Sequence, residues 1–152
     1  MYILGLNIFH GDSSACLLSD GKLIAAAEEE RFRRVKHWAG FPSESIKWCL
    51  SEANISLNDI NHISINQDSK SNILKKIIYT ILKRPSLRML LGRFQNKHKR
   101  LSIKEYLLKE FPNSKFTGLI HSVEHHTAHL SSAFHVAPFT KSVVVSVDGF
   151  GD

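Results

Sequence analysis

Long apolar runs and cysteines are both scarce in this 152-residue chain. No apolar run approaches the roughly 20 residues that cross a membrane, and residues 1–7 lack the basic segment that opens a signal peptide. We therefore expect a cytoplasmic protein without a membrane span. Cys16 and Cys49 lack the spacing of a metal site and are too few for a disulfide scaffold. Both are expected to be small, buried hydrophobic side chains.

Acidic residues are absent from residues 69–104, which hold eleven Lys or Arg. The rest of the chain is net acidic, although the whole carries a formal charge of +6. A basic stretch can attract nucleic acid, an anionic membrane surface or a phosphorylated substrate, and it is also typical of a solvated helical face. Apolar residues recur at helical spacing over residues 73–82, and the pattern breaks near Pro85 and resumes over 87–94. Because charge alone supplies no base-reading element, we favour a solvated or partner-packing face over nucleic-acid binding.

The apolar patterns outside this stretch predict an α/β fold in one domain. Asp20-Gly21 suits the positive φ angles of a tight hairpin, and Ser43 after Pro42 suits the N-cap of a helix that runs to Ala53. Further helices are expected over residues 103–110 and 125–134, and strands over residues 2–9, 14–18, 22–27, 60–65, 117–123 and 142–147. The order is a βββαβ core with a basic helical insertion at about residues 69–110. Since the final turn directly follows a predicted buried strand, we expect the chain to be the first part of a longer protein.

Two histidines four residues apart are the most informative feature of the chain. If residues 125–134 are helical, His125 and His129 share one face, with Cβ atoms about 5 to 6 Å apart. The strand over residues 142–147 is expected to place Asp148 as a third ligand. Two imidazoles and one carboxylate on one side of a divalent ion leave positions open for substrate, as in catalytic metal sites.

Two glycine-containing turns are candidate binding loops. His10-Gly11-Asp12-Ser13-Ser14 separates the first two strands, and its amides, Asp12 and serines suit an anion, while His10 is a candidate acid or base. Asp148-Gly149-Phe150-Gly151-Asp152 has the same character after a later strand, so the two turns could face one ligand. The alternative for the first loop is an ordinary polar hairpin, because Gly, Asp and Ser are common turn residues.

A run of charge covers residues 28–37. Its simplest interpretation is a solvated strand end in which residues two apart pair their charges. A functional interpretation requires Lys36 or Arg34 to reach a phosphate, although both residue types are mostly found on surfaces.

Four separated motifs together resemble the O-carbamoyltransferases of the nodulation-factor, cephalosporin and tobramycin type. The motifs span nearly the whole chain, and their order and spacing agree with the family. They are Ile3-Leu4-Gly5-Leu6-Asn7 with Phe9-His10; Ala25-Ala26-Ala27-Glu28-Glu29-Glu30-Arg31-Phe32 with Lys36-His37 and Phe41-Pro42; His125-His126-Thr127-Ala128-His129-Leu130 with Ser132-Ala133-Phe134; and Val147-Asp148-Gly149. The resemblance implies the N-terminal subdomain of an actin-like ATPase (ribonuclease-H-like) fold, similar to the tRNA threonylcarbamoyl-transfer proteins.

The resemblance also implies site residues and cofactors. His125, His129 and Asp148 match ligands of a divalent metal, iron in the best-known relatives, which a carboxylate from the later half of the family sequence completes. His10 matches the proposed base, and Lys36 matches a residue that binds carbamoyl-adenylate. Apart from the resemblance, Asp12 and Gly149 in the two turns are further candidate substrate contacts, as is His126, which lies off the face shared by the two ligand histidines and for which a packed surface histidine is an equal alternative.

The implied reaction uses ATP to activate carbamoyl phosphate in a downstream domain. The N-terminal domain then transfers the carbamoyl group to a hydroxyl of a small molecule or glycan. A metal that polarises the carbonyl and a histidine that takes the hydroxyl proton are physically suited to this step.

Two departures separate this chain from the family pattern. Gly11 stands where the family usually has an Asp directly after the histidine, and the later half with the activating domain is absent, so we expect the chain alone to be inactive. One alternative is a non-catalytic module that docks an anionic partner through residues 70–104. Another is a sugar-kinase-like member of the same superfold.

Overall fold

The computed structural model describes residues 1–68 and 102–148. These fall into two parts, residues 1–68 with 114–148 and residues 102–113, and each is considered by itself. The helices expected over residues 73–82 and 87–94 lie outside the described residues. Within the described ranges, no helix is long and apolar enough to cross a membrane.

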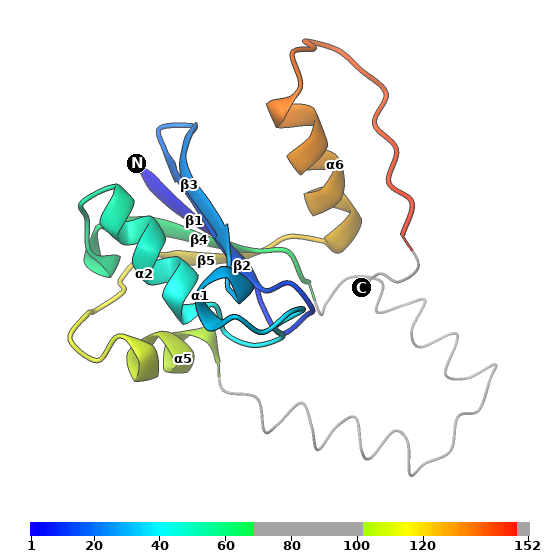
Figure 1. Ribbon diagram of the computed structural model, residues 1–152. Helices are drawn as coiled ribbons and strands as arrows, with labels where there is room; N and C mark the ends of the chain where they lie inside the picture. The colour runs from blue at the N-terminus through cyan, green and yellow to red at the C-terminus, as the bar shows by residue number, and fades with distance from the viewer. Residues whose placement is uncertain (69–101, 149–152) are drawn as a thin grey trace, which may run out of the picture. The chain divides into compact units, whose positions relative to one another are not determined.

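A five-stranded mixed sheet is the centre of the first part. Its strands are β1 (Tyr2–Asn7), β2 (Ser14–Ser19), β3 (Lys22–Glu28), β4 (Ile60–Ile65) and β5 (Leu119–Ser122). Their order is β3-β2-β1-β4-β5, in which β1, β2 and β3 form an antiparallel meander and β4 pairs in parallel with both β1 and β5 (Figure 1). The expected strands in these regions are therefore confirmed, as is the α/β class.

The turn between β2 and β3 has the expected conformation. Asp20 has a φ of 49° and Gly21 a φ of 78°, so both central residues are left-handed, as a two-residue hairpin requires. The N-terminal ammonium group of Met1 binds Asp20 Oδ1 at 2.7 Å and ties the start of β1 to this turn.

One face of the sheet forms the core. Alternate strand residues such as Leu4, Leu17 and Ile63 are fully buried, because side chains with period two point to the same face. Helix α2 (Ser43–Glu52) contributes Ile46 and Cys49 at helical spacing, and both are fully buried as well. Helix α2 is in contact with β2 and β3. Cys49 is thus the buried hydrophobic side chain that was expected, whereas Cys16 is only partly buried.

Four further helical elements lie in the described residues. They are α1 (Glu30–Arg33), the 3-10 turn η1 (Leu57–Asp59), α5 (Ile103–Glu110) and α6 (His125–Val136). In the second part of the chain, α5 begins with a reciprocal capping box between Ser102 and Glu105. Its expected range is confirmed, and α6 extends two residues beyond the range expected for it.

Three local expectations are wrong. Residues 142–147 are not a strand, and Val143, Val145 and Val147 are 92%, 76% and 93% exposed. Within the described residues this segment pairs with no strand of the sheet, so its apolar run alone did not produce one. The charged run is not an extended solvated end either, because the chain turns into α1 at Glu30. Ser43 is the first residue of α2 and not its N-cap, a position that Pro42 occupies.

Candidate metal centre and its flanking loops

Several candidate residues lie at one edge of the sheet. Because β1, β4 and β5 are parallel, their carboxyl ends share one edge. The loop of residues 8–13 leaves β1 at this edge, and α6 begins three residues after β5. Ligand sites in sheets of this kind form beyond the carboxyl ends of the parallel strands.

Three ligand atoms converge beside α6. Asp148 Oδ2 lies 2.6 Å from His125 Nε2 and 3.4 Å from His129 Nε2, and the two imidazole nitrogens are 3.1 Å apart. Donors about 2.1 Å from one ion at tetrahedral or octahedral angles are themselves roughly 3.0–3.4 Å apart. The separation of the two nitrogens and that of His129 from Asp148 lie in this range, whereas the 2.6 Å hydrogen bond between His125 and Asp148 would lengthen by about 0.4 Å if both bound one divalent ion.

Helix α6 places both histidines on one face, because they are four residues apart. Glu124 caps the helix, since its carboxylate accepts from Thr127 N at 2.7 Å and from Thr127 Oγ1 at 2.9 Å. The Thr127 backbone hydrogen bond is the main reason that the pKa of Glu124 lies below its ordinary value. His126 points elsewhere, and its Nδ1 lies 3.1 Å from Ser146 Oγ. The contact expected of His126 with substrate stays a prediction.

Asp148 reaches this position differently from the expectation. The segment that carries it is exposed and unpaired with the sheet, so the carboxylate is not presented by a strand end. Gly149 and the rest of the acidic turn lie outside the described residues.

The loop of residues 8–13 is hydrogen-bonded to the segment of residues 36–40, although Ser13 and Gly40 are 27 positions apart in the sequence. Ser13 is fully buried, and its Oγ accepts from Gly40 N at 3.1 Å and donates to Gly40 O at 2.9 Å or His10 O at 3.0 Å. Ser13 N also donates to Trp38 O at 3.0 Å, and Phe9 N donates to Gly40 O at 3.1 Å. The predicted binding loop after β1 is thus joined to the segment that carries Lys36.

Asp12 and His37 form a second link between these loops. His37 Nδ1 lies 2.9 Å from Asp12 Oδ1, and both side chains are largely exposed. His10 and Lys36 are exposed too, which is compatible with contact to a ligand. Their catalytic and binding roles remain predictions.

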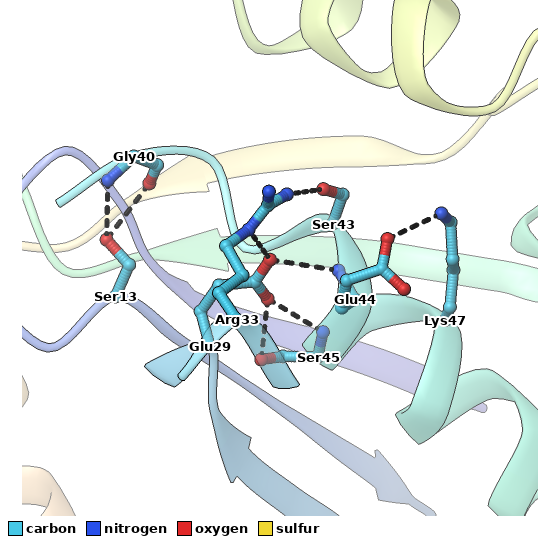
Figure 2. Close-up of polar contacts among 8 residues, drawn as sticks. All are labelled: Ser13, Glu29, Arg33, Gly40, Ser43, Glu44, Ser45 and Lys47. Carbon is cyan, nitrogen blue, oxygen red and sulfur yellow. Dashed lines mark hydrogen bonds and ion pairs between the residues drawn. The ribbon is translucent and has the colours of Figure 1, made fainter. Parts of the chain in front are cut away.

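A buried carboxylate that the sequence interpretation missed lies behind these loops. Glu29 is fully buried, and Figure 2 shows its two oxygens surrounded by donors. Oε2 accepts from Ser45 N at 2.8 Å and Ser45 Oγ at 2.9 Å, while Oε1 accepts from Arg33 Nε at 2.7 Å and Glu44 N at 3.2 Å. Glu29 therefore caps α2, where Pro42 offers no side-chain acceptor.

The donors decide the charge state of Glu29. Burial raises its pKa, but hydrogen bonds from Ser45 N, Arg33 and Glu44 N to the charged form outweigh burial and hold the pKa below its ordinary value. Its signal in the sequence is strand period, since Ala25 and Glu29 are both buried and Ala27 between them is half-buried. The alternation of inward-facing residues in β3 therefore continues just past the end of the strand, to Glu29.

An open cavity of about 870 Å³ adjoins the candidate metal centre. Its lining includes His125 and His129 from α6 and small residues such as Gly5, Cys16 and Ala26 from the sheet. A cavity of this size can hold a small organic ligand.

Comparison with known proteins gives this site a family. The family model described as the carbamoyltransferase N-terminus matches residues 2–152. The chain belongs to this carbamoyltransferase family. The resemblance that the four motifs indicated is therefore confirmed.

Individual relatives are much longer than this carbamoyltransferase chain. It is 33% identical over 159 residues to the uncharacterized protein sll1178 of Synechocystis sp. (strain PCC 6803), which covers 99% of the chain and 26% of that protein. It is 32% identical over 147 residues to Nodulation protein NolNO of Sinorhizobium fredii, covering 96% of the chain and 20% of that protein. The uncharacterized protein MJ1051 of Methanocaldococcus jannaschii is 27% identical over 150 residues, which are 99% of the chain and 22% of that protein. The chain thus spans about a quarter or less of the length of these curated relatives.

Proposed function

We propose that this chain forms the N-terminal part of an ATP-dependent O-carbamoyltransferase. The observation that carries the proposal is the convergence of His125, His129 and Asp148 in a chain of the carbamoyltransferase family. The reaction would move a carbamoyl group from carbamoyl phosphate, through carbamoyl-adenylate, to a hydroxyl of a small molecule or glycan.

The sheet supports an actin-like, ribonuclease-H-like subdomain as the finer fold. Such a subdomain begins with an antiparallel meander whose first strand then pairs in parallel with the strand after the first helix. The order β3-β2-β1-β4-β5 agrees with that arrangement. The basic stretch of residues 69–104 is then an insertion between β4 and β5.

The candidate metal centre would hold a divalent ion, with iron expected from the resemblance. His125, His129 and Asp148 would be its ligands in this chain, with a further carboxylate from later family sequence. The bound ion would polarise the carbamoyl carbonyl and stabilise the negative charge that develops on its oxygen.

The protein's own residues would bind the donor and move the proton. Lys36 and Asp12, on the two joined loops, would contact the carbamoyl-adenylate, with His126 and Gly149 as further contacts. His10 would take the proton of the acceptor hydroxyl as its oxygen bonds to the carbamoyl carbon. The bond from that carbon to the adenylate oxygen breaks, and AMP leaves.

An assay of the complete gene product tests this function. ATP, carbamoyl phosphate and a panel of hydroxylated small molecules and oligosaccharides are supplied, and AMP and the carbamoylated product are followed by mass spectrometry. We expect AMP release that depends on both carbamoyl phosphate and an acceptor, and we expect His10→Ala to lower product formation by about 100-fold or more. Lys47→Ala, which removes an exposed residue paired with Glu44 at 2.7 Å, is the matched control and should leave the rate unchanged.

Two other outcomes would contradict the proposal. ATP hydrolysis without consumption of carbamoyl phosphate would favour a sugar-kinase-like activity. No turnover, combined with salt-sensitive binding of an anionic partner through residues 70–104, would favour the non-catalytic module.

A further inference from the structure

The segment of residues 36–40, which carries Lys36, has a conformation that needs support from outside. It contains no helix or strand, and His37 has a φ of 53°, as Arg34 just before it has a φ of 58°. Left-handed φ angles are unfavourable for residues other than glycine and persist only where neighbouring contacts hold them. His37 N donates to Glu30 Oε2 at 3.1 Å, but this bond is at the surface.

The first firm support is the loop of residues 8–13. Buried Ser13 binds both Trp38 O and the backbone of Gly40, as described above. These bonds fix the backbone at the far end of the segment. They do not fix the Trp38 ring or the end that emerges from α1.

The second support is Arg33 at the end of α1. Its guanidinium carbon lies 4.6 Å from the centre of the Trp38 ring, within the range of a cation–π contact. The same guanidinium is held from behind, since Nε donates to Glu29 Oε1 at 2.7 Å and Nη2 donates to Ser43 Oγ at 2.9 Å (Figure 2). Arg33 therefore has one fixed position, set by the buried carboxylate that caps α2.

The Trp38 ring depends on this stacking. Its Nε1 is buried and has no hydrogen-bond partner in the part of the chain that the structure describes, so packing and not a polar bond holds the ring. The ring in turn covers Gly40, where an added Cβ would lie 3.0 Å from Trp38 Nε1. Arg33, Trp38 and Gly40 thus form a continuous stack from the core to the loop of residues 8–13.

We propose that Arg33 is a positioning residue that orders the segment of residues 36–40 through Trp38 and so fixes where Lys36 meets the carbamoyl donor. The last clause rests on the proposed function, whereas the ordering of the segment does not. Glu29 neutralises and orients Arg33, and Arg33 orients Trp38. The planar guanidinium is needed because only a fork can bond Glu29 and Ser43 while its face covers a ring.

The ordering can be measured in the ligand-free chain. The chain has two tryptophans, so Trp48→Phe leaves Trp38 as a single fluorescent reporter. In this background we expect Arg33→Lys to keep the charge beside Glu29, and with it the melting temperature, but to raise acrylamide quenching of Trp38 by about twofold to fivefold. Arg33→Met should raise quenching further. Arg31→Met is the matched control, because Arg31 is 71% exposed and lies 3.9 Å from Glu28.

Activity of the complete gene product provides the second measurement. With carbamoyl-adenylate supplied directly as the donor, we expect Arg33→Lys to raise the KM for carbamoyl-adenylate by about fivefold while kcat changes by less than about twofold. A merely structural defect would instead lower the amount of active enzyme, and therefore kcat, without changing KM.

The outcomes separate the two proposals. Unchanged Trp38 quenching in folded Arg33→Lys and Arg33→Met overturns the positioning role, as does raised quenching with an unchanged KM in an active enzyme. If Arg33→Met fails to fold, Arg33→Lys decides alone. A wild-type gene product that transfers no carbamoyl group, with quenching raised as expected, rejects the proposed function and leaves the ordering of the segment standing.

Discussion

At the scale of single residues, Glu29 shows how a charge becomes part of a core. A buried carboxylate is tolerated only when donors replace water, and Glu29 has two backbone amides, a hydroxyl and a guanidinium as donors. The sequence presents three consecutive glutamates, and composition alone does not distinguish them. Only the alternation of inward-facing residues in β3 distinguishes Glu29 from the other two. Its donors on α2 belong to residues 15 and 16 positions later in the sequence.

Replacing Glu29 with alanine should strongly destabilise the chain. Glu29→Ala leaves Arg33, Ser45 N and Glu44 N without their acceptor, and breaking a partly buried pair in this way costs about 3–5 kcal/mol. Urea denaturation at neutral pH measures the loss. The control is Glu44→Gln, which removes a surface pair with Lys47 and should change the free energy of unfolding by less than about 1 kcal/mol. Equal effects of the two variants would contradict the role assigned to Glu29.

The stability that Glu29 contributes should also depend on pH. Its pKa in the folded chain lies below the ordinary value, so the folded state binds the proton more weakly than the unfolded state. The contribution is therefore fully present above the unfolded pKa of about 4.3 and is lost as pH falls through the folded pKa. We expect the difference in unfolding free energy between wild type and Glu29→Gln to shrink from pH 6 to pH 3. A difference that stays constant over this range would show that Glu29 is not the titrating group.

At the scale of elements, local pattern predicted the sheet because each strand has its own evidence. Strands β1, β2 and β4 alternate buried and less buried residues, and the hairpin between β2 and β3 carries a turn dipeptide. Residues 142–147 form a valine-rich apolar run typical of a buried strand, but a strand also needs a neighbour to satisfy its backbone groups. Their pattern describes the side chains that such a strand would present and contains no information about the partner.

The pairing of β1 with β2 depends on the absence of a side chain at Gly5. Gly5 lies opposite Cys16 in the register, and an added Cβ would come within 2.6 Å of Cys16 Sγ. We expect Gly5→Ala to destabilise the chain by about 1–3 kcal/mol, and Cys16→Ala to restore most of this loss in the double variant. A double-mutant cycle by urea denaturation measures the coupling.

Another glycine serves as the control for this cycle. At Gly11 an added Cβ would meet nothing within 4 Å, so Gly11→Ala should change stability by no more than about 0.5 kcal/mol. Additive effects of Gly5→Ala and Cys16→Ala would show that the clash with Sγ is not the cause.

At the scale of the whole molecule, the candidate site divides into a predictable and an unpredictable half. The spacing of His125 and His129 follows from one helix, so the sequence suffices to place both nitrogens together. The joined loops depend on Ser13 and Gly40, whose contact spans 27 positions and involves common turn residues. A contact between residues so far apart in the sequence depends on the path of the whole chain between them, including α1. No local sequence pattern describes that path.

Metal binding should stabilise the folded chain, because the three proposed ligands lie on segments 19 residues apart or more and come together only after folding. At a metal concentration about 100 times the Kd, the free energy of unfolding should rise by about 2.7 kcal/mol. The measurement is thermal and urea denaturation with ferrous iron under anaerobic conditions, and with zinc. His129→Ala should abolish the stabilisation, whereas His135→Ala, which removes a histidine in the last turn of the same helix, should leave it intact.

Because the chain supplies only part of the proposed ligand set, we expect weak binding, so the metal must be titrated to high concentration. Stabilisation that persists in His129→Ala would show that the ion binds elsewhere, and the metal assignment would then be wrong even if the transferase assignment stood.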